Sequence, residues 1–400
     1  MEYLWNGDTG TRYEQLFKVT SLNSKKESVE HADIVSIVWF KIFPARFGGQ
    51  KGIALFTRYL SQYFKIICLC SNDNEIPDEN FKVKPVLTSG KKQFFHLSGY
   101  NKILRLIKQS KCRYILLEHC YYGLVGVFLK RRLHKLLIVH SHNIEYLRFK
   151  EQGTWWWKLL FMLEKYTYRH ADLVFFKTEE DRTFAIEKFK LKNKTALVPY
   201  GIEKKVFDKQ KSRSYLQQIH SIPEENKIIL FAATLDYLPN ARAVKLIYNS
   251  LAPALENYPC TILICGRNKI KGFEYLSRLK ACNVVNCGEV DNISDYFGGA
   301  DVFIDPVEIA AGVQTKILDA LSYDLNVVCF EHILNGIDRS VTGEKILAAE
   351  RNNTNQFIEL IKKACEVNTS IPETFYEKYE WTHIARETAE AIGNLNPSNE

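Results

Sequence analysis

Short apolar runs alternate with longer segments of helical periodicity along most of this chain. The runs have the length of strands and are rich in branched and aromatic side chains, which is typical of strands buried on both faces of a sheet. This alternation predicts a parallel sheet with helices on both faces. The first series of predicted strands comprises Ile34–Phe40, Lys65–Cys70, Tyr114–Leu117, Leu136–His140, Leu173–Phe176 and Ala196–Val198.

The alternation then begins again, which is expected because 400 residues exceed what one hydrophobic core usually serves. The second series of predicted strands comprises Ile228–Ala232, Thr261–Cys265, Val284–Cys287, Val302–Ile304 and Val327–Phe330. The predicted helices include Ile53–Tyr63, Lys102–Ser110, Trp155–His170, Ala241–Asn257, Phe273–Ala281, Thr315–Ser322 and Ile384–Ile392.

We therefore predict an α/β fold of two doubly wound, Rossmann-like domains, at residues 33–200 and 201–375. The join lies in Gly201–Ser221, which is charged and has little apolar content. Residues 1–32 form an extension whose role the pattern leaves open, and residues 376–400 contain a C-terminal helix. Ligands of open parallel sheets bind outside the carboxyl ends of the strands, so we expect the site in the cleft between the domains.

The composition narrows the class of protein. No stretch reaches the roughly 18 consecutive apolar residues of a membrane helix, and Met1–Gly10 lacks the apolar core of a signal peptide, so we expect a cytoplasmic protein. The cysteines do not form paired CxxC motifs, which argues against a structural zinc site. The net charge of +8 suits anionic lipid or a phosphorylated substrate, or reflects only solvated helix faces. No signature of a nucleic-acid module is present, so no nucleic-acid partner is expected.

The segment from Asp305 to Leu321 carries the most informative motif. A predicted strand is followed by a loop of small residues and then by a helix. The N–H groups and positive dipole end of that helix suit a diphosphate, Lys316 adds a full charge, and Asp319 can accept hydrogen bonds from ribose hydroxyls. A plain surface helix is the alternative. The residues predicted to meet the phosphates at the helix start are Gly312, Val313, Gln314 and Thr315.

Two loops of the first domain also carry candidates. Gly48 and Gly49 follow the first predicted strand, where glycines let the backbone approach a ligand closely or form a plain tight turn. His142 follows another predicted strand in the segment His140–Glu145, and a histidine there either contacts a ligand or is a hydrogen-bonded core residue. Glu118 and His119 form a similar pair after Tyr114–Leu117 and are weaker candidates.

In their order along the chain, these motifs resemble glycosyltransferase family 4, which has the GT-B fold. The resemblance covers roughly residues 33–393, and Gly312, Lys316 and Asp319 match the donor-binding motif. Asp319 stands where the family has glutamate, and a second acid of the family, eight residues earlier, is missing at Ala311. Glu308, in the same loop, is a candidate substitute. The loop after Ile228–Ala232 lacks the family's phosphate-binding Arg and Lys, so Arg267 is a further donor-binding candidate.

The resemblance implies a sugar transferase that uses a nucleotide-sugar donor and retains anomeric configuration without a metal or other cofactor. It implies Lys316 and His142 as catalytic residues, with His142 near the reacting sugar. It also implies that the last helix, which begins near Glu380–Thr382, crosses back to the first domain, and it suggests a role in bacterial surface polysaccharide biosynthesis. The chain has no Asp-x-Asp motif, which agrees with metal-free chemistry.

The acceptor is less defined, and we expect a glycan or a lipid-linked molecule. Trp155, Trp156 and Trp157 begin an aromatic-rich helix, which either belongs to the core of the first domain or contacts an anionic membrane at the inner face of the plasma membrane. Two other functions stay open: a sugar-nucleotide 2-epimerase of the same fold, and a sugar-nucleotide-binding protein without transfer activity.

Overall fold

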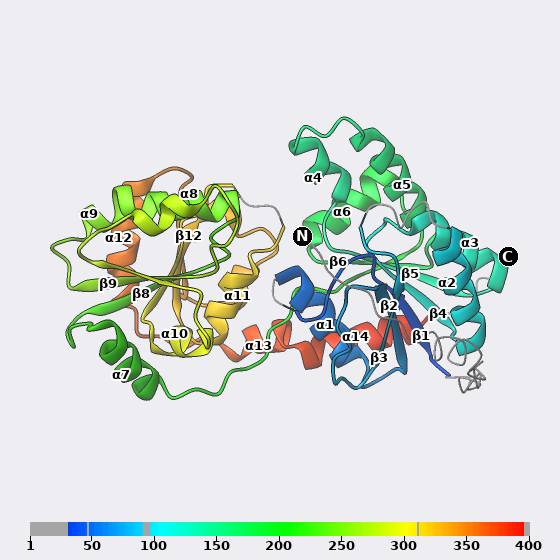
Figure 1. Cartoon of the computed structure of the whole chain (residues 1–400), viewed down its shortest axis with the longest axis horizontal. Coiled ribbons are helices and arrows are strands. Elements are labelled where there is room, and N and C mark those ends of the chain that lie inside the picture. The colour runs from blue at the N-terminus through cyan, green and yellow to red at the C-terminus, as the bar shows by residue number, and fades with distance from the viewer. Residues whose placement is uncertain (1–30, 46–47, 91–96, 310–311, 396–400) are drawn as a thin grey trace, which may run out of the picture.

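The computed structural model describes residues 31–45, 48–90, 97–309 and 312–395, which form two α/β domains side by side (Figure 1). Most of the N-terminal extension predicted at residues 1–32 lies outside the described residues. Within the described part, no helix is long and apolar enough to cross a membrane.

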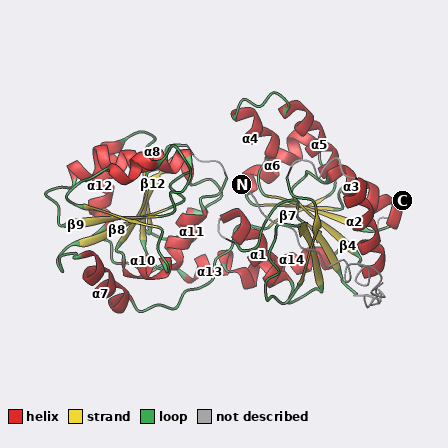
Figure 2. Cartoon of the chain, viewed as in Figure 1, coloured by secondary structure: helices red, strands yellow, loops and turns green. Residues whose placement is uncertain are grey.

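The first domain contains a seven-stranded sheet in the order β3-β2-β1-β4-β5-β6-β7. All its strand pairs are parallel. Helices α1 and α14 cover one face of the sheet, and α2, α3, α5 and α6 cover the other (Figure 2). Its strands are β1 (Ile34–Ile37), β2 (Ile66–Ser71), β3 (Lys82–Leu87), β4 (Tyr114–Glu118), β5 (Leu136–Ser141), β6 (Leu173–Phe176) and β7 (Lys194–Leu197). Its helices are α1 (Gly48–Leu60), α2 (Leu97–Ser110), α3 (Gly123–Leu133), α4 (Glu145–Glu151), α5 (Trp157–His170) and α6 (Glu179–Phe189).

The second domain contains a six-stranded parallel sheet in the order β10-β9-β8-β11-β12-β13. The two sheets confirm the predicted pair of doubly wound units. The strands are β8 (Lys227–Ala232), β9 (Cys260–Cys265), β10 (Val284–Gly288), β11 (Val302–Asp305), β12 (Asn326–Phe330) and β13 (Ile346–Ala349). The α-helices are α7 (Lys209–His220), α8 (Leu238–Leu246), α9 (Ala252–Ala254), α10 (Ile293–Gly299), α11 (Thr315–Ser322), α12 (Thr354–Ala364), α13 (Glu373–Tyr379) and α14 (Trp381–Gly393).

Several elements differ from the sequence-based expectations. The predicted helix Phe273–Ala281 is only a 3₁₀ turn, Glu274–Arg278. The predicted join also contains α7, whose first turn is capped by the Asp208 side chain and whose Ser212 and Leu216 are buried. Strands β3 and β13, at one edge of each sheet, were missed, whereas the other edge strands, β7 and β10, were predicted. Strand β3 mixes lysines and a proline with its apolar residues, so its pattern is weak.

The chain passes between the domains twice at one place. A parallel bridge joins Ile202, after the first crossing, to Glu380, before the second. Helix α14 then packs against α1, and Trp381 lies completely buried in the core of the first domain. A Cβ atom at Gly201 would collide with the Trp381 ring, so only glycine lets the two crossing segments lie this close.

Candidate functional site

The loops at the carboxyl ends of the two sheets touch one another across the domain boundary. A Cβ atom at Gly48, the first residue of α1, would lie 2.8 Å from the Thr315 hydroxyl at the start of α11. A Cβ atom at Gly312 would collide with the Asn143 amide oxygen, which belongs to the first domain. The predicted loops therefore face each other, and α1 and α11 meet end to end near their N-termini (Figure 1).

The loop between β11 and α11 has the geometry of an anion-binding helix start. Gly312 has a φ of 70°, in the left-handed region that favours glycine. Helix α11 then begins at Thr315, so the segment brings the N–H groups of its first turn to the domain boundary, where that of Thr315 donates to the Val313 backbone oxygen at 3.0 Å. Glu308 lies in the same loop, and its backbone oxygen is 2.7 Å from His332 Nε2. Ala311, where the family's second acid is missing, lies outside the described residues.

Lys316 is held in place by a buried carboxylate. Its Nζ lies 2.8 Å from Asp305 Oδ1, at the end of β11, and 3.2 Å from Asn240 Oδ1. The Asp305 side chain is completely buried, which raises its pKa, and the Lys316 ammonium acts in the opposite direction. An ammonium group carries three N–H donors, so these two partners leave one for a ligand.

Asp319 has different partners from Lys316, although the sequence placed both on one helix face. Its carboxylate lines a cavity of about 420 Å³ between the domains, together with Lys51, Tyr200 and Lys205. Burial raises the pKa of Asp319 to about 6, and Lys51 and Lys205 oppose this shift. The aspartate is therefore ionised at neutral pH and available as a hydrogen-bond acceptor.

Arg267 follows β9 and reaches the neighbouring loop after β8. Its guanidinium lies 3.3 Å from Asp236 Oδ1. The other oxygen of Asp236 accepts N–H groups from Lys269 at 2.8 Å and Ile270 at 3.2 Å. Arg267 is therefore fixed to its own domain by a buried aspartate.

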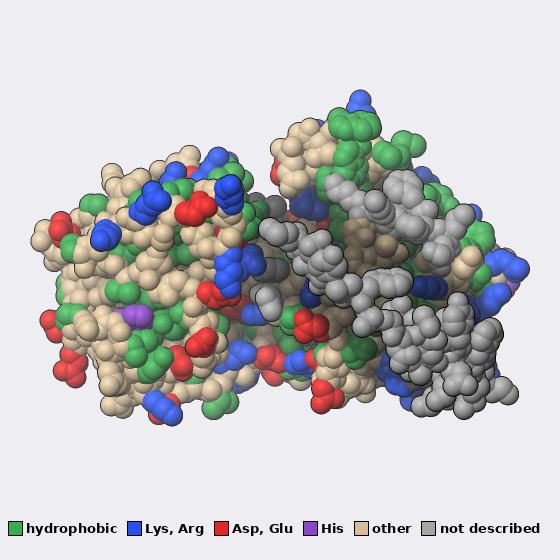
Figure 3. All heavy atoms as spheres, in the orientation of Figure 1, with side chains coloured by type: hydrophobic (Ala, Val, Ile, Leu, Met, Phe, Trp, Pro, Cys, Tyr) green, Lys and Arg blue, Asp and Glu red, His purple; other side chains and the backbone are tan. Residues whose placement is uncertain are grey.

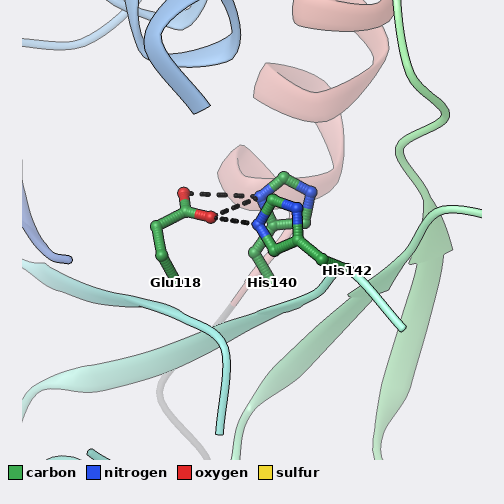
Figure 4. Close-up of side chains that lie close together, drawn as sticks. All are labelled: Glu118, His140 and His142. Carbon is green, nitrogen blue, oxygen red and sulfur yellow. Dashed lines mark hydrogen bonds and ion pairs between the residues drawn. The ribbon is translucent and has the colours of Figure 1, made fainter. Parts of the chain in front are cut away.

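In the first domain, a compact group forms where β4 and β5 end: Glu118, His140 and His142 (Figure 4). Glu118 and His140 are register partners in neighbouring strands. Glu118 Oε2 lies 2.6 Å from His142 Nε2 and 3.1 Å from His140 Nδ1. The Glu118 and His140 side chains are 0% exposed, and that of His142 is 11% exposed.

The charges in this group follow from burial and from the short contacts. Burial acts to raise the pKa of Glu118, but His140 and His142 outweigh it and hold the pKa well below its usual range. Burial, followed by the neighbouring His140 and His119, holds the pKa of His142 well below its usual value. Burial also lowers the pKa of His140 to about 4. At neutral pH the group is thus an ionised carboxylate between two neutral imidazoles.

Among the described residues, Glu118, His140 and His142 are the group that could hold a metal ion, since one ligand atom from each lies within 4.8 Å of the others. Two imidazoles and a carboxylate are ligands used by zinc and iron. The buried Lys177 ammonium, after β6, interacts electrostatically with Glu118 and His140 and would repel a dication. That these three residues lie together was not predicted from the sequence.

Sequence reasoning also missed the surroundings of His142. Its ring stacks on His119, with ring centroids 4.4 Å apart, and packs on His140 at 4.3 Å. His119 has a φ of 68°, which is unusual for a residue other than glycine, and its Nδ1 lies 3.4 Å from Glu145 Oε1. The sequence shows Glu118 and His119 as an adjacent acid and histidine. It does not show that their strand lies beside the strand of His142, on which the ring stacking depends.

Both domains match known family models. Residues 48–205 match the model described as Glycosyltransferase Family 4, and residues 226–366 match the model described as Glycosyl transferases group 1. An uncharacterized glycosyltransferase of Methanocaldococcus jannaschii is 24% identical over 241 residues. That alignment covers 57% of this chain and 57% of the relative, so the match spans little more than half the length of the relative.

Solved structures resemble the whole described fold at low sequence identity. HepE of Anabaena, crystallised with UDP and glucose, has a TM-score of 0.68 and 14% identity, and the match covers 91% of this chain and 100% of HepE. Sucrose-phosphate synthase of Thermosynechococcus elongatus has a TM-score of 0.69 and 16% identity, with 91% of this chain and 99% of the synthase covered. At these identities the likeness shows a shared fold.

Proposed function

We propose that this chain, a glycosyltransferase of the family 4 and group 1 type with the GT-B fold, moves a sugar from a nucleotide-sugar donor to a glycan or lipid-linked acceptor with retention of configuration. The observation that carries the proposal is the start of α11, where Gly312 and Thr315 lie against Asn143 and Gly48 of the first domain. Lys316, in the same turn, pairs with the buried Asp305. The binding of UDP by the similarly folded HepE supports a nucleotide-sugar donor.

Each part of the donor has a matching group in this proposal. The N–H groups of residues 312–314 and the ammonium of Lys316 receive the diphosphate, and the Asp305 carboxylate, 2.8 Å away, holds that ammonium in place. Asp319 accepts hydrogen bonds from the ribose. Arg267, after β9, and Glu308, after β11, lie on separate loops of the second domain and are secondary donor contacts.

The reaction needs stabilisation of the negative charge that develops on the leaving diphosphate. Fixed N–H groups and one lysine supply it in a site already arranged before the reaction, and a bound acceptor supplies proximity. We expect no metal requirement. The contacts of Gly48 with Thr315 and of Gly312 with Asn143 form where the domains close, and closure gates the step.

The donor is tested by thermal unfolding with UDP-, GDP-, ADP- and CMP-sugars. We expect one nucleotide class to stabilise the protein, by about 2.7 kcal/mol at a hundred times Kd, and Lys316→Ala to abolish this shift. Turnover is then measured with and without an acceptor. Conversion of a UDP-sugar in the absence of acceptor would identify an epimerase instead, and binding without any turnover would identify a sugar-nucleotide-binding protein.

The first domain carries an exposed apolar ridge that supports a membrane-near acceptor. Trp156 and Trp157 pack into the core of the domain, whereas Trp155 is 89% exposed. Leu159 and Met162, at helical spacing from Trp155, are 67% and 65% exposed. We define the ridge as Trp155, Leu159 and Met162; green side chains gather over α4 and α5 in Figure 3.

One basic side chain, Lys158, is exposed beside the ridge on the same helix. Arg131 and Arg132 are exposed at the end of α3, near the other end of α5, where Lys130 contacts the His170 backbone oxygen. Apolar and basic groups together suit an anionic bilayer surface. We therefore include in the proposal a peripheral position at the inner face of the plasma membrane and a role in bacterial surface polysaccharide biosynthesis.

Co-sedimentation with vesicles tests the ridge. We expect binding to vesicles of phosphatidylglycerol and phosphatidylcholine, weaker binding to phosphatidylcholine alone, and a loss of binding when Trp155, Leu159 and Met162 are all replaced by serine. The matched control is Ile270→Ser, because Ile270 is 51% exposed on the second domain. Equal sedimentation of the triple variant and the wild type would remove the ridge from the proposal.

A further inference from the structure

The two ring nitrogens of His142 have different surroundings. Nε2 lies 2.6 Å from Glu118 Oε2, inside the first domain. Nδ1 has no hydrogen-bond partner among the residues that the structure describes. Because the two nitrogens of an imidazole point in different directions, a ring held through Nε2 presents Nδ1 away from Glu118.

The Glu118 carboxylate can only accept hydrogen bonds, because it is ionised. Its side chain is 0% exposed, and its contacts in the cluster are His142 Nε2 and His140 Nδ1. Burial lowers the pKa of Lys177, at the next strand end, to about 7, so this side chain is only partly charged at neutral pH, and its ammonium has no hydrogen-bond partner among the described residues. A neutral imidazole carries one proton, so the carboxylate selects the tautomer of His142 with that proton on Nε2.

The plane of the His142 ring is fixed from both sides. His140 packs on one face at a centroid distance of 4.3 Å, and His119 stacks on the ring at 4.4 Å with an interplanar angle of 29°. The next residue, Asn143, touches Gly312 of the donor loop. The hydrogen bond through Nε2 and the two ring contacts therefore hold the lone pair of Nδ1 in a defined direction, one residue before the contact of Asn143 with the donor loop.

We propose that Glu118 is a positioning residue, which holds His142 as the Nε2–H tautomer so that Nδ1 accepts a hydrogen bond from a sugar hydroxyl beside the donor loop. No proton passes to Glu118, which remains a carboxylate throughout. This inference rests on the proposed transfer reaction for its kinetic consequence, but the tautomer itself is a property of the free protein.

The same three side chains could bind a metal ion, and the distances favour hydrogen bonds instead. Ligands of tetrahedral zinc, with bonds of about 2.0 to 2.1 Å, are separated by more than 3 Å, because a tetrahedral angle spreads them. Glu118 Oε2 and His142 Nε2 are only 2.6 Å apart, which is the separation of a short hydrogen bond and not of two ligands on one ion. Metal binding is therefore an outcome that would overturn the proposal.

The first experiment reads the tautomer without any substrate. Long-range ¹⁵N–¹H spectra of histidine-labelled protein, with the His142 signals assigned from His142→Asn, report which ring nitrogen carries the proton. We expect a neutral Nε2–H ring in the wild type and a mixture of tautomers in Glu118→Gln. The control is Glu145→Gln, whose carboxylate contacts His119 and not His142. A His142 signal unchanged in Glu118→Gln would overturn the proposal.

The second experiment measures kinetics. We expect Glu118→Gln to lower kcat about 10- to 100-fold, by analogy with carboxylates that orient metal-bound histidines, with little change in nucleotide-induced stabilisation. Because Glu118 acts through His142, the same change should have almost no effect in a His142→Ala background. Full additivity of the two changes would assign Glu118 a merely structural role. A larger effect on KM for the donor or for the acceptor tells which sugar provides the hydroxyl.

The pH profile supplies a further readout. The groups facing His142 are Glu118, His140, His119 and Lys177, with Glu145 behind His119. Loss of the negative charge at Glu118 lowers the pKa of His142, so the acidic limb of kcat should move to lower pH in Glu118→Gln.

Loss of activity on chelation, restored by zinc, would show a metal centre and reject the proposal. A wild type that is inactive with every donor would count against the transferase function alone, since the spectra still decide the tautomer.

Discussion

The two domains share a parallel, doubly wound architecture and differ in what their sheets present to the domain boundary. The second domain offers a helix start and one lysine, whose charge is paired with a single buried aspartate. The first domain offers side chains from three neighbouring strand ends, in which a buried carboxylate lies among imidazoles. In the proposed reaction, the second domain binds the negatively charged diphosphate, and the first domain directs hydrogen bonds to the neutral hydroxyls of a sugar.

The outer surfaces differ as well. Helices α4 and α5 form a hairpin that projects from the first domain (Figure 1). The Glu164 carboxylate on α5 accepts the N–H groups of Glu145 at 2.9 Å and Tyr146 at 3.1 Å, so it caps the start of α4 from a distance. Because Glu145 also contacts His119, the base of the projecting hairpin is connected to the imidazole stack. Buried polar groups, Glu164 and Glu145, thus connect the surface hairpin of the first domain to its candidate site.

The largest effect is expected when Lys316, the lysine of the second domain, is replaced. We expect Lys316→Ala to lower kcat/KM by about 10² to 10³, the size of losing one donor that stabilises a developing anion. We also expect a stability loss of about 3 to 5 kcal/mol, because Asp305 is left buried without its partner. Initial rates and thermal unfolding measure the two effects.

A compensated variant separates these two losses. Combining Lys316→Met with Asp305→Asn removes both charges, so most of the stability should return while donor binding stays lost. If the compensated variant is still stabilised by the nucleotide-sugar, the diphosphate does not depend on Lys316, and the proposed division of roles between the domains is wrong.

A second change acts on the first domain alone. Glu164→Ala leaves two N–H groups of α4 without their buried acceptor, and we expect a loss of about 1 to 3 kcal/mol in the free energy of unfolding. Hydrogen exchange should increase in residues 145–151, and donor-induced stabilisation should stay as in the wild type. Glu187→Ala, on the exposed surface of α6, is the control and should change stability by less than about 0.5 kcal/mol. Uniformly faster exchange across both domains would contradict this separation.

The smallest expected effect concerns Asp319 and pH. Burial raises the pKa of Asp319 to about 6. Between about pH 4 and 6 the folded protein therefore holds a proton that the unfolded chain has released. The free energy of unfolding thus falls as pH rises through this window. The ionised form accepts hydrogen bonds from ribose, so affinity for the donor should rise about tenfold from pH 5 to pH 7. Calorimetry with an intact nucleotide-sugar, which does not titrate in this range, measures the change. Asp319→Asn should remove the pH dependence, and an Asp319→Asn protein with the wild-type profile would take Asp319 out of the ribose site.

Much of the donor half was determined by the sequence itself. The apolar periods predict both sheets, because strands buried on two faces leave a continuous apolar signal, and the predicted helix Thr315–Ser322 agrees with the structure. Gly312, Lys316 and Asp319 lie within one strand–loop–helix unit, so local spacing alone brings them to the same end of the sheet. Strands β3 and β13 were not predicted. Strand β3 mixes lysines and a proline with its apolar residues, which weakens its pattern, whereas the edge strands β7 and β10 were predicted.

The polar contacts of the candidate site and the exposure of its surroundings depend on tertiary contacts. Glu118, His142 and Lys177 come from three strand ends far apart in the sequence, and they meet only because β4, β5 and β6 are neighbours in the sheet. The same holds for Asp305, whose pairing with Lys316 was not predicted, and for the three adjacent tryptophans, of which only Trp155 faces solvent. Residue spacing specifies local geometry, whereas burial, and with it protonation and charge pairing, depends on which distant segments pack together.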